Sequence, residues 1–369
     1  MSAPISRRQV WLRTAETLLI AASGGLVFVF AGFPAGLISG SLLAVAAAAL
    51  LGRPMTVPLP LARVVFVVVG ISLGAVVTPE LLQSMASFPV TLAVLTVSTV
   101  CIIAATAAYL RIVHGWDAQT AVFGASPGAL AQVMAMAAEY GADLRAIAIV
   151  QVMRVVLLTV GIPAGLALFG LSAGAMPRIA AGGGSPMELA VLIVASTATA
   201  LAMLWLRLPG GLLFGAMIGS AVLHGGGLLQ ANLPPWAVAA AVIGIGAVTG
   251  SRFANTDPRT LLRYLGAALG SFAVGMAVTS AFVLVLTTLL SVRIADAVVA
   301  FSPGAQDTMM VLALALHLDP IFVGAHHLWR FLLVTLSLPW QVRRAGGSSP
   351  KRKLPPEQRP SDRAAPPGD

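Results

Sequence analysis

Long apolar stretches alternate with short polar, glycine or proline joints over most of the chain. Twelve such stretches are recognised, with edges uncertain by a few residues: 15–31, 34–51, 61–78, 88–110, 117–139, 144–171, 187–206, 209–227, 235–250, 261–289, 296–317 and 320–340. Their lengths match those of helices that cross or enter a bilayer, where the backbone must satisfy its own hydrogen bonds. The pattern therefore predicts an all-α polytopic membrane protein.

One stretch of 29 residues occurs twice, at 126–154 and 302–330, with eight identical positions. The identities include serine, proline, glycine, aspartate and arginine, which apolar composition alone would not supply. Further matches at nearly the same offset extend the likeness: Pro34, Gly36, Gly40, Gly70 and Gly74 correspond to Pro209, Gly211, Gly215, Gly246 and Gly250. The sequence therefore predicts an internal duplication.

The duplication and the distribution of charge divide the chain into five parts. These are a cytoplasmic N-terminal tail (1–14), membrane repeat 1 (15–171), a glycine-rich linker (172–186), membrane repeat 2 (187–340) and a disordered basic C-terminal tail (341–369). Only 9% of the residues are charged, whereas a soluble domain has about a quarter. Most of the net charge of +9 lies in the two tails. Such charge indicates cytoplasmic anchoring rather than nucleic-acid binding.

Arginines between the apolar segments indicate how the chain crosses the membrane. If all twelve segments cross, these arginines divide evenly between the two sides. If 117–139 and 296–317 are re-entrant, eight lie on one side and two on the other, as the positive-inside rule expects. We therefore expect about ten transmembrane helices, two broken re-entrant segments and inverted repeats. Both termini would lie on the cytoplasmic side of a bacterial inner membrane.

Each copy of the repeated stretch begins with a helix-breaking triplet and ends with an arginine. The triplets are Ser126-Pro127-Gly128 and Ser302-Pro303-Gly304, and the arginines are Arg154 and Arg330. Helical arms of about ten residues, roughly 15 Å long, would bring the breaks to the bilayer midplane. There, free N–H groups and a guanidinium could bind an anion or take part in a proton relay. Alternatively, the arginines cap carbonyl groups or pair with a carboxylate.

Polar neighbours of the breaks and of the arginines complete the candidate substrate-binding set. They are Gln132, Gln151, Gln306, Asp307 and His327. Asp307 is a candidate partner for an arginine, or else marks a water-exposed helix start. His327 and its neighbour His326 could carry protons, or could hydrogen bond to carbonyl groups.

The remaining charged and sulfur-containing residues are expected to have structural roles. Asp143 and Asp319 are interpreted as helix N-caps. Four other carboxylates are expected to be solvated charges at segment ends: Glu80, Asp117, Glu139 and Asp296. Cys101 and the methionines that follow the breaks (Met134, Met136, Met309 and Met310) are expected to pack. No phosphate-binding loop, metal-ligand spacing or nucleophile motif is found, so we expect no enzyme, no metal and no cofactor.

At Gly124 to Ala129 with Arg154, and at Phe301 to Ala305 with His327 to Arg330, the chain resembles the AbrB family of duplicated bacterial membrane proteins. The likeness covers nearly everything from about residue 15 to residue 340. It implies either regulation of gene expression or ammonia monooxygenase activity, the two descriptions that members carry. The family shares its name with a small DNA-binding regulator that this chain does not resemble.

Three functions are therefore open to this sequence. The first is a transporter-like protein that handles a small anionic solute at a midplane site between the repeats. The second is a membrane regulator of gene expression that acts through a cytoplasmic partner, and the third is a monooxygenase. The expected partners are the lipid bilayer and a small solute but no nucleic acid, and homo-oligomerisation is left open.

Overall fold

The computed structural model describes residues 6–77, 88–128, 130–171, 184–208, 210–254, 256–290 and 292–344, and within these ranges every regular element is a helix. The helices are α1 (Arg7–Phe30), α2 (Gly36–Leu50), α3 (Leu59–Gly74), α5 (Phe88–His114), α6 (Ala118–Ala125), α7 (Leu130–Tyr140), α8 (Leu144–Leu168), α9 (Pro186–Trp205), α10 (Gly211–Gly225), α11 (Pro235–Gly250), the 3₁₀ turn η2 (Ser251–Phe253), α12 (Pro258–Leu289), α13 (Ile294–Phe301), α14 (Gln306–Ala315) and α15 (Pro320–Arg344). Each apolar segment coincides with a helix or a broken helix. The all-α fold class is confirmed.

Seven of these helices are long and apolar enough to cross a membrane: α1, α5, α8, α9, α11 with η2, α12 and α15. Three further apolar helices, α2, α3 and α10, have 15 or 16 residues. Helix α1 begins at Arg7, within the stretch expected as a tail, where Ser6 and Gln9 form a capping box. These lengths and compositions are those of a membrane protein.

Helices α1, α2, α3, α9, α10 and α11, together with η2, form a group that we call the glycine bundle. Within it α2 packs on α11 and α3 packs on α10, so each contact pairs one half of the chain with the other. Glycines permit these close crossings. A Cβ atom on Gly246 would lie 2.6 Å from the Cβ of Ser41, and one on Gly70 would lie 2.7 Å from the Cβ of Ala216.

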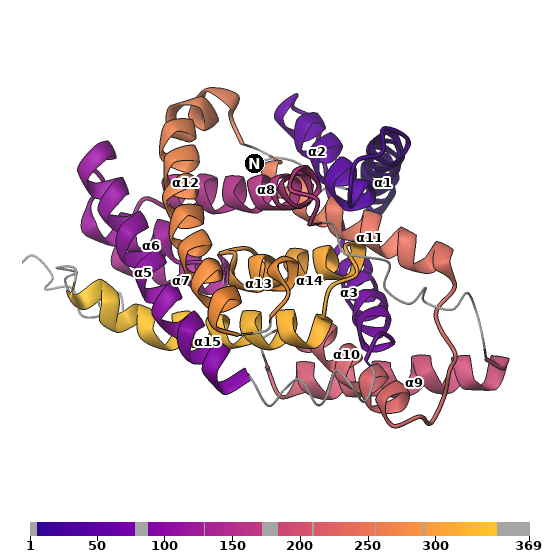
Figure 1. Cartoon of the computed structure of the whole chain (residues 1–369). Coiled ribbons are helices and arrows are strands. Elements are labelled where there is room, and N and C mark those ends of the chain that lie inside the picture. Colours follow the sequence, from indigo (N-terminus) through magenta and orange to yellow (C-terminus); the bar gives the residue numbers. More distant parts are fainter. Residues whose placement is uncertain are drawn as a thin grey trace, which may run out of the picture.

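Helices α5 to α8 and α12 to α15 form a second group, the broken-helix bundle. Here α5 packs on α12, α6 on α8 and α13 on α15. Figure 1 shows α13 and α14 in the middle of the molecule, between α8 and α15. Helix α14 also contacts α2, α3 and α11 of the glycine bundle. The broken helix α13–α14 therefore lies where the two bundles meet.

Both predicted helix breaks are confirmed. Helix α6 ends at Ala125 and α7 begins at Leu130, while α13 ends at Phe301 and α14 begins at Gln306. Ser126 and Ser302, the residues before the prolines, have extended backbone, because proline disfavours a helical conformation in the residue that precedes it.

The start of each broken segment also lies beside its end. The hydroxyl of Thr120 in α6 accepts the backbone N–H of Asp143, just before α8, at 3.0 Å. In the second half, Asp296 in α13 accepts the N–H of Asp319, just before α15, at 2.9 Å. The chain therefore runs to the break and returns beside its own starting point.

The backbone repeats at the joints as well. Among the described residues, eight of the twelve with positive φ form pairs at an offset of 175 or 176 positions: Gly32 with Arg207, Ala35 with Gly210, Gly52 with Gly227, and Gly141 with His317. Residues other than glycine, such as Ala35, Arg207 and His317 here, adopt this conformation uncommonly. Their presence at these positions indicates that the helix joint, rather than the residue type, is what the two halves share.

Three of the sequence-based expectations fall outside the described residues. They concern the linker over 172–183, the C-terminal tail over 345–369 and the carboxylate Glu80.

Candidate functional site

The two arginines that end the repeated stretches are buried and bind backbone carbonyl groups. Arg154 is 6% exposed and donates to the carbonyl oxygens of Gly124, Ala125 and Ser126 at 3.4, 3.3 and 3.0 Å. Arg330, 1% exposed, donates to Ala300 at 2.8 Å and to Ser302 at 2.5 Å. The equivalent arginine therefore caps the equivalent helix end in each half.

Helix α6 shows why such caps are needed. The last four carbonyl groups of a helix have no partner within it, and a buried end must find one elsewhere. Ser126 donates to Val122 through its N–H and its hydroxyl. The side-chain amide of Gln151 donates to Phe123, and Arg154 takes the last two. All four carbonyl groups are satisfied, and the guanidinium charge faces the negative end of the helix dipole.

The histidines of the second half follow the same arrangement. Nε2 of His327 hydrogen bonds to the carbonyl oxygen of Val299 at 3.0 Å, where Gln151 serves in the first half. His326 bonds through Nδ1 to the carbonyl of Phe322 and through Nε2 to the hydroxyl of Thr91. Of the two roles considered, this geometry favours hydrogen bonding to carbonyl groups.

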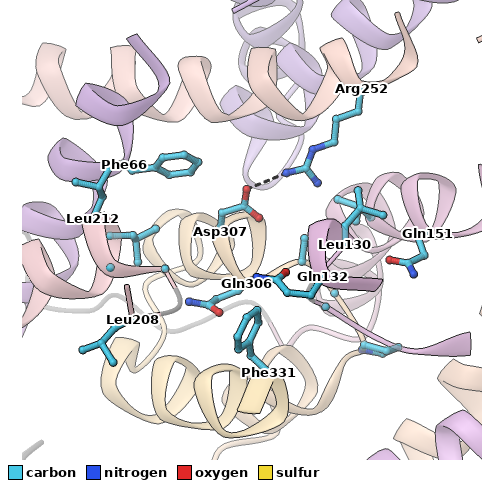
Figure 2. Close-up of a pocket in the computed structure, with 18 of the residues that line it drawn as sticks. Phe66, Leu130, Gln132, Gln151, Leu208, Leu212, Arg252, Gln306, Asp307 and Phe331 are labelled. Atoms are coloured by element: carbon cyan, nitrogen blue, oxygen red, sulfur yellow. Dashed lines mark hydrogen bonds and ion pairs between the residues drawn. The ribbon is translucent and has the colours of Figure 1, made fainter. Parts of the chain in front are cut away.

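A cavity of about 400 Å³ lies beside the capped helix ends, between the two bundles (Figure 2). The broken-helix bundle contributes the tips of both broken helices at Gly128, Pro303 and Gly304. The glycine bundle contributes the α9–α10 joint around Gly210 and the residue Arg252 in η2. A Cβ atom on Gly128 would lie 4.0 Å from the carbonyl oxygen of Gly304, so the two tips meet at this cavity.

One ion pair crosses the cavity from bundle to bundle. Nη2 of Arg252 lies 3.1 Å from Oδ2 of Asp307, the second residue of α14. The side chains remain 26% and 20% exposed, and Figure 2 shows them above Gln306 and Gln132. Asp307 does have an arginine partner, as the sequence indicated, but this partner is Arg252 rather than either capping arginine.

The cavity brings together part of the candidate set. Its lining includes eight of the thirteen predicted residues: Gly128, Gln132, Gln151, Arg154, Pro303, Gly304, Gln306 and Asp307. The other five lie in the helix breaks and caps away from the lining: Ser126, Pro127, Ser302, His327 and Arg330. Ser126 and Ser302 are fully buried and donate to the carbonyls of Val122 and Val298.

Sequence reasoning missed several residues of the lining. The sequence identifies Arg252 only as a charge between helices, and it does not identify the apolar residues of the lining, which include Phe66, Leu130, Leu208, Leu212 and Phe331. Of these lining residues, Gly210 alone is marked in the sequence, because it aligns with Ala35 just before the duplicated glycines. In the structure both residues have left-handed backbone. The rest come from distant parts of the chain that folding brings together.

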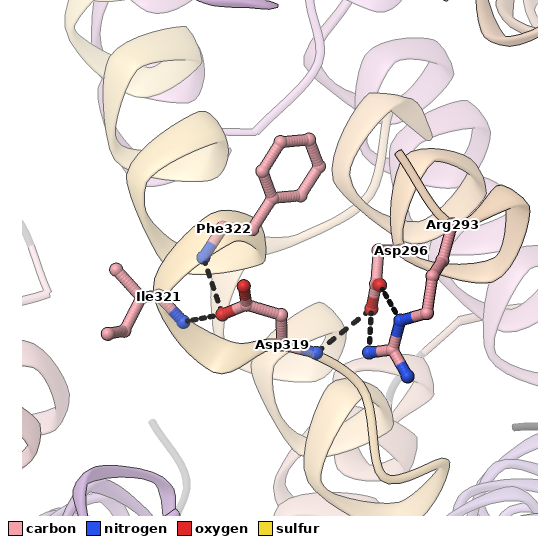
Figure 3. Close-up of polar contacts among 5 residues, drawn as sticks. All are labelled: Arg293, Asp296, Asp319, Ile321 and Phe322. Atoms are coloured by element: carbon pink, nitrogen blue, oxygen red, sulfur yellow. Dashed lines mark hydrogen bonds and ion pairs between the residues drawn. The ribbon is translucent and has the colours of Figure 1, made fainter. Parts of the chain in front are cut away.

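The polar contacts at the entrance to α13 correct one expectation (Figure 3). Asp296 was expected to be a solvated charge, but it is 4% exposed. It holds Arg293 through two contacts at 2.6 and 3.1 Å and accepts the N–H of Asp319. Asp319 caps α15 by accepting from Ile321 and Phe322, as predicted. Burial, and then the nearby charge of Asp296, raise the pKa of the Asp319 carboxyl above its ordinary value.

Other residues expected to have structural roles lie at a helix start, in the core and on α5. Asp143 accepts the N–H groups of Arg145 and Ala146 and so caps α8 as predicted. Met309 and Met310 are fully buried in the core, and Cys101 is half-buried on α5. Within the described residues, no three His, Cys, Asp or Glu side chains are grouped so that they could hold a metal ion.

Comparison with known proteins agrees with the resemblance seen in the repeats. The family model described as "Transition state regulatory protein AbrB" matches residues 6–346. A protein of Escherichia coli (strain K12) named "Putative regulator AbrB" is 27% identical over 335 residues, covering 88% of this chain and 94% of that protein. The "Uncharacterized protein YhjN" of Bacillus subtilis (strain 168) is 27% identical over 239 residues, covering 60% of this chain and 62% of that protein. Since the family model spans nearly the whole chain, the protein belongs to the AbrB family.

Proposed function

We propose that this protein is a transporter-like protein of the bacterial inner membrane that handles a small anionic solute. The observation that carries the proposal is the cavity at which both broken helices meet and which Arg252 and Asp307 line from opposite bundles. Irregular backbone at membrane depth is tolerated where it lines a cavity, and transporters place their solute between repeats at such breaks. The proposal gives no residue a catalytic role.

The proposal includes ten crossings and inverted repeats, with both termini cytoplasmic. The proposal assigns the ten crossings to the seven long helices and the three shorter apolar ones. The return of each broken segment to its starting point supports re-entrance. In addition, the hydroxyl of Tyr264, early in α12, donates to Asp143 at 3.0 Å. Helices α6, α8 and α12 therefore begin at one end of the molecule, which the inverted arrangement requires.

Single cysteines can test this arrangement in a Cys101→Ser background. Arg111 and Arg259 are both exposed, and inverted repeats place both on the cytoplasmic side. We expect Arg111→Cys and Arg259→Cys to react with a membrane-impermeant maleimide only in inside-out vesicles. Ile294→Cys, at a position 42% exposed, should react only in right-side-out cells. Opposite sidedness of positions 111 and 259 would instead support parallel repeats.

Transport itself can be tested with purified protein in proteoliposomes on a solid-supported membrane. Concentration jumps of lactate, glutamate and benzenesulfonate, as sodium salts, should produce currents for at least one anion, absent from protein-free liposomes. Arg252→Gln should reduce that current at least tenfold, because it removes the more exposed of the two cations that line the cavity. Arg53→Gln, which breaks the ion pair with Glu16 outside the cavity, should leave it unchanged. Equal currents with and without protein for every anion would refute transport.

A second candidate function is regulation of gene expression through a cytoplasmic partner. It is favoured by the printed name of the Escherichia coli relative and by the family description. Deletion of the gene would then change transcript levels. Wild-type levels would be restored by Arg252→Gln but not by a chain lacking residues 345–369, which lie beyond the end of α15. The opposite pattern of rescue would favour transport as the cause.

A further inference from the structure

The charge of the cavity indicates the class of solute. Among its lining residues Arg154 and Arg252 are cationic and Asp307 is the one carboxylate. Arg154 donates to three carbonyl oxygens and not to a carboxylate, so its charge is not cancelled by an anionic side chain. Helix α14 begins at Gln306 in the lining, and the positive end of its dipole adds to the same sign. The site therefore favours a monoanion.

The ion pair in the cavity has the geometry of an exchangeable contact. Arg252 and Asp307 share a single contact at 3.1 Å. Arg293 and Asp296, by contrast, share two contacts, at 2.6 and 3.1 Å, and the aspartate is buried. A guanidinium binds a carboxylate most strongly through two parallel hydrogen bonds. Arg252 therefore retains donors for a second carboxylate, and it is exposed enough to reach one in the cavity.

The opposite wall is apolar. Phe66, Leu208 and Leu212 lie together on one side of Arg252 and Asp307, while Phe331 lies beyond Gln306 (Figure 2). A cavity of about 400 Å³ lies within the range of small-molecule sites, in which a few polar groups orient a mainly apolar ligand. An inorganic anion would leave this wall without a partner.

We propose that the cavity binds a small monocarboxylate with an apolar body, and that Arg252 is the residue that binds its carboxylate group by exchanging Asp307 for the ligand. The inference rests on the proposed function in taking this cavity as the solute site. Since Arg252 belongs to the glycine bundle and Asp307 to the broken-helix bundle, the exchange replaces the ion pair between bundles with a contact to the ligand. Solute binding thereby loosens one connection between the two bundles.

Equilibrium binding to the full chain in detergent tests the proposal without any transport step. The probes are benzoate and hexanoate, each paired with its neutral amide of nearly the same shape, benzamide and hexanamide. We expect at least one carboxylate to bind, and to bind at least tenfold more tightly than its amide. Arg252→Gln should weaken carboxylate binding at least tenfold. Asp307→Asn should strengthen it several-fold, because it removes the competitor for Arg252.

The opposite signs distinguish a solute site from a structural ion pair. If the pair only holds the bundles together, both substitutions change affinity in the same direction, and that result overturns the proposal. Equal binding of acid and amide, or no binding of either carboxylate to the wild-type chain, also overturns it. Arg53→Gln serves as a matched control at another single-contact pair, and melting temperatures of all variants establish that they are folded.

The two proposals can fail separately. Binding of benzoate with opposite effects at positions 252 and 307, but without current from any anion, would refute transport and leave the carboxylate site in place. Currents from anions that lack an apolar body, without benzoate or hexanoate binding, would refute the carboxylate site and leave transport in place.

Discussion

Arg330→Leu is expected to prevent the protein from accumulating in its folded form. The guanidinium is 1% exposed and supplies the hydrogen bonds to the carbonyl oxygens of Ala300 and Ser302 at the end of α13. Each buried polar group left without a partner costs about 1–3 kcal/mol, and leucine removes both donors. The loss, about 2–6 kcal/mol, is a large part of the 5–15 kcal/mol that typically holds a protein folded. Size-exclusion chromatography of a fluorescent fusion measures the outcome.

Two further variants separate capping from other roles of this helix face. Arg344, on the same helix, is exposed and stacks over Trp340, so Arg344→Leu should leave folding unchanged. His327→Gln introduces the residue that the first half uses for the same carbonyl bond, and it should fold. A monodisperse Arg330→Leu protein with the wild-type melting temperature would show that the carbonyl groups find other partners.

The local features of the fold could be predicted because the reasons for them are local. Apolar length predicts the helices, and Ser-Pro-Gly predicts a break wherever it occurs. An aspartate before a helix predicts a cap, as at Asp143 and Asp319. The duplication adds strength to each prediction, since every feature is seen twice. Even the alternative role of the arginines, as caps for carbonyl groups, follows from the rule that a buried helix end needs donors.

The cavity could be predicted only in part, because it is built where the halves differ and where distant segments meet. Asp307 stands out in the sequence, since its counterpart is Ala131. Its partner Arg252 is 55 positions away, in a turn between two helices. No local sequence pattern predicts that these two residues form an ion pair. Phe66 and Phe331 are ordinary apolar residues in apolar helices. Only the packing of the two bundles brings them to one cavity.

The burial of Asp296 could not be predicted, for a related reason. A carboxylate at the end of an apolar segment usually faces water, and the sequence offers nothing to contradict this. The structure buries it against the turn before α15, where it satisfies both Arg293 and the N–H of Asp319. In the first half the same turn is held by the hydroxyl of Thr120. The two halves therefore use different chemistry for one contact, and alignment alone does not reveal it.

The matched glycines show the reverse case, in which the sequence identifies positions but not their purpose. Gly70 and Gly74 align with Gly246 and Gly250, which could mean only that each half has a similar helix. The structure shows that they cross between halves, with α3 against α10 and α11 against α2. Helices approach this closely only where a side chain is absent from the contact. These glycines therefore hold the two repeats together.

Gly74→Ala is accordingly expected to lower stability sharply for a change of one methyl group. The new Cβ would overlap the carbonyl oxygen of Met217 and lie 2.6 Å from the Cβ of Ser220 and 2.7 Å from the backbone nitrogen of Ala221. Backbone atoms cannot rotate away, so α3 and α10 must separate. Overpacking of this kind costs about 1–3 kcal/mol or more, which should appear as a melting temperature lower by several degrees in detergent.

Gly161→Ala provides the matched control, because the same substitution in the middle of α8 meets no atom within 4 Å. Alanine favours a helix over glycine by about 0.5–1 kcal/mol, so this variant should melt at or above the wild-type temperature. Helix propensity alone predicts stabilisation by both substitutions, whereas close crossing predicts opposite signs. If Gly74→Ala also raised the melting temperature, α3 and α10 could not cross as closely as described. The contact between the repeats at this point would then be looser than the positions of Gly70 and Gly74 indicate.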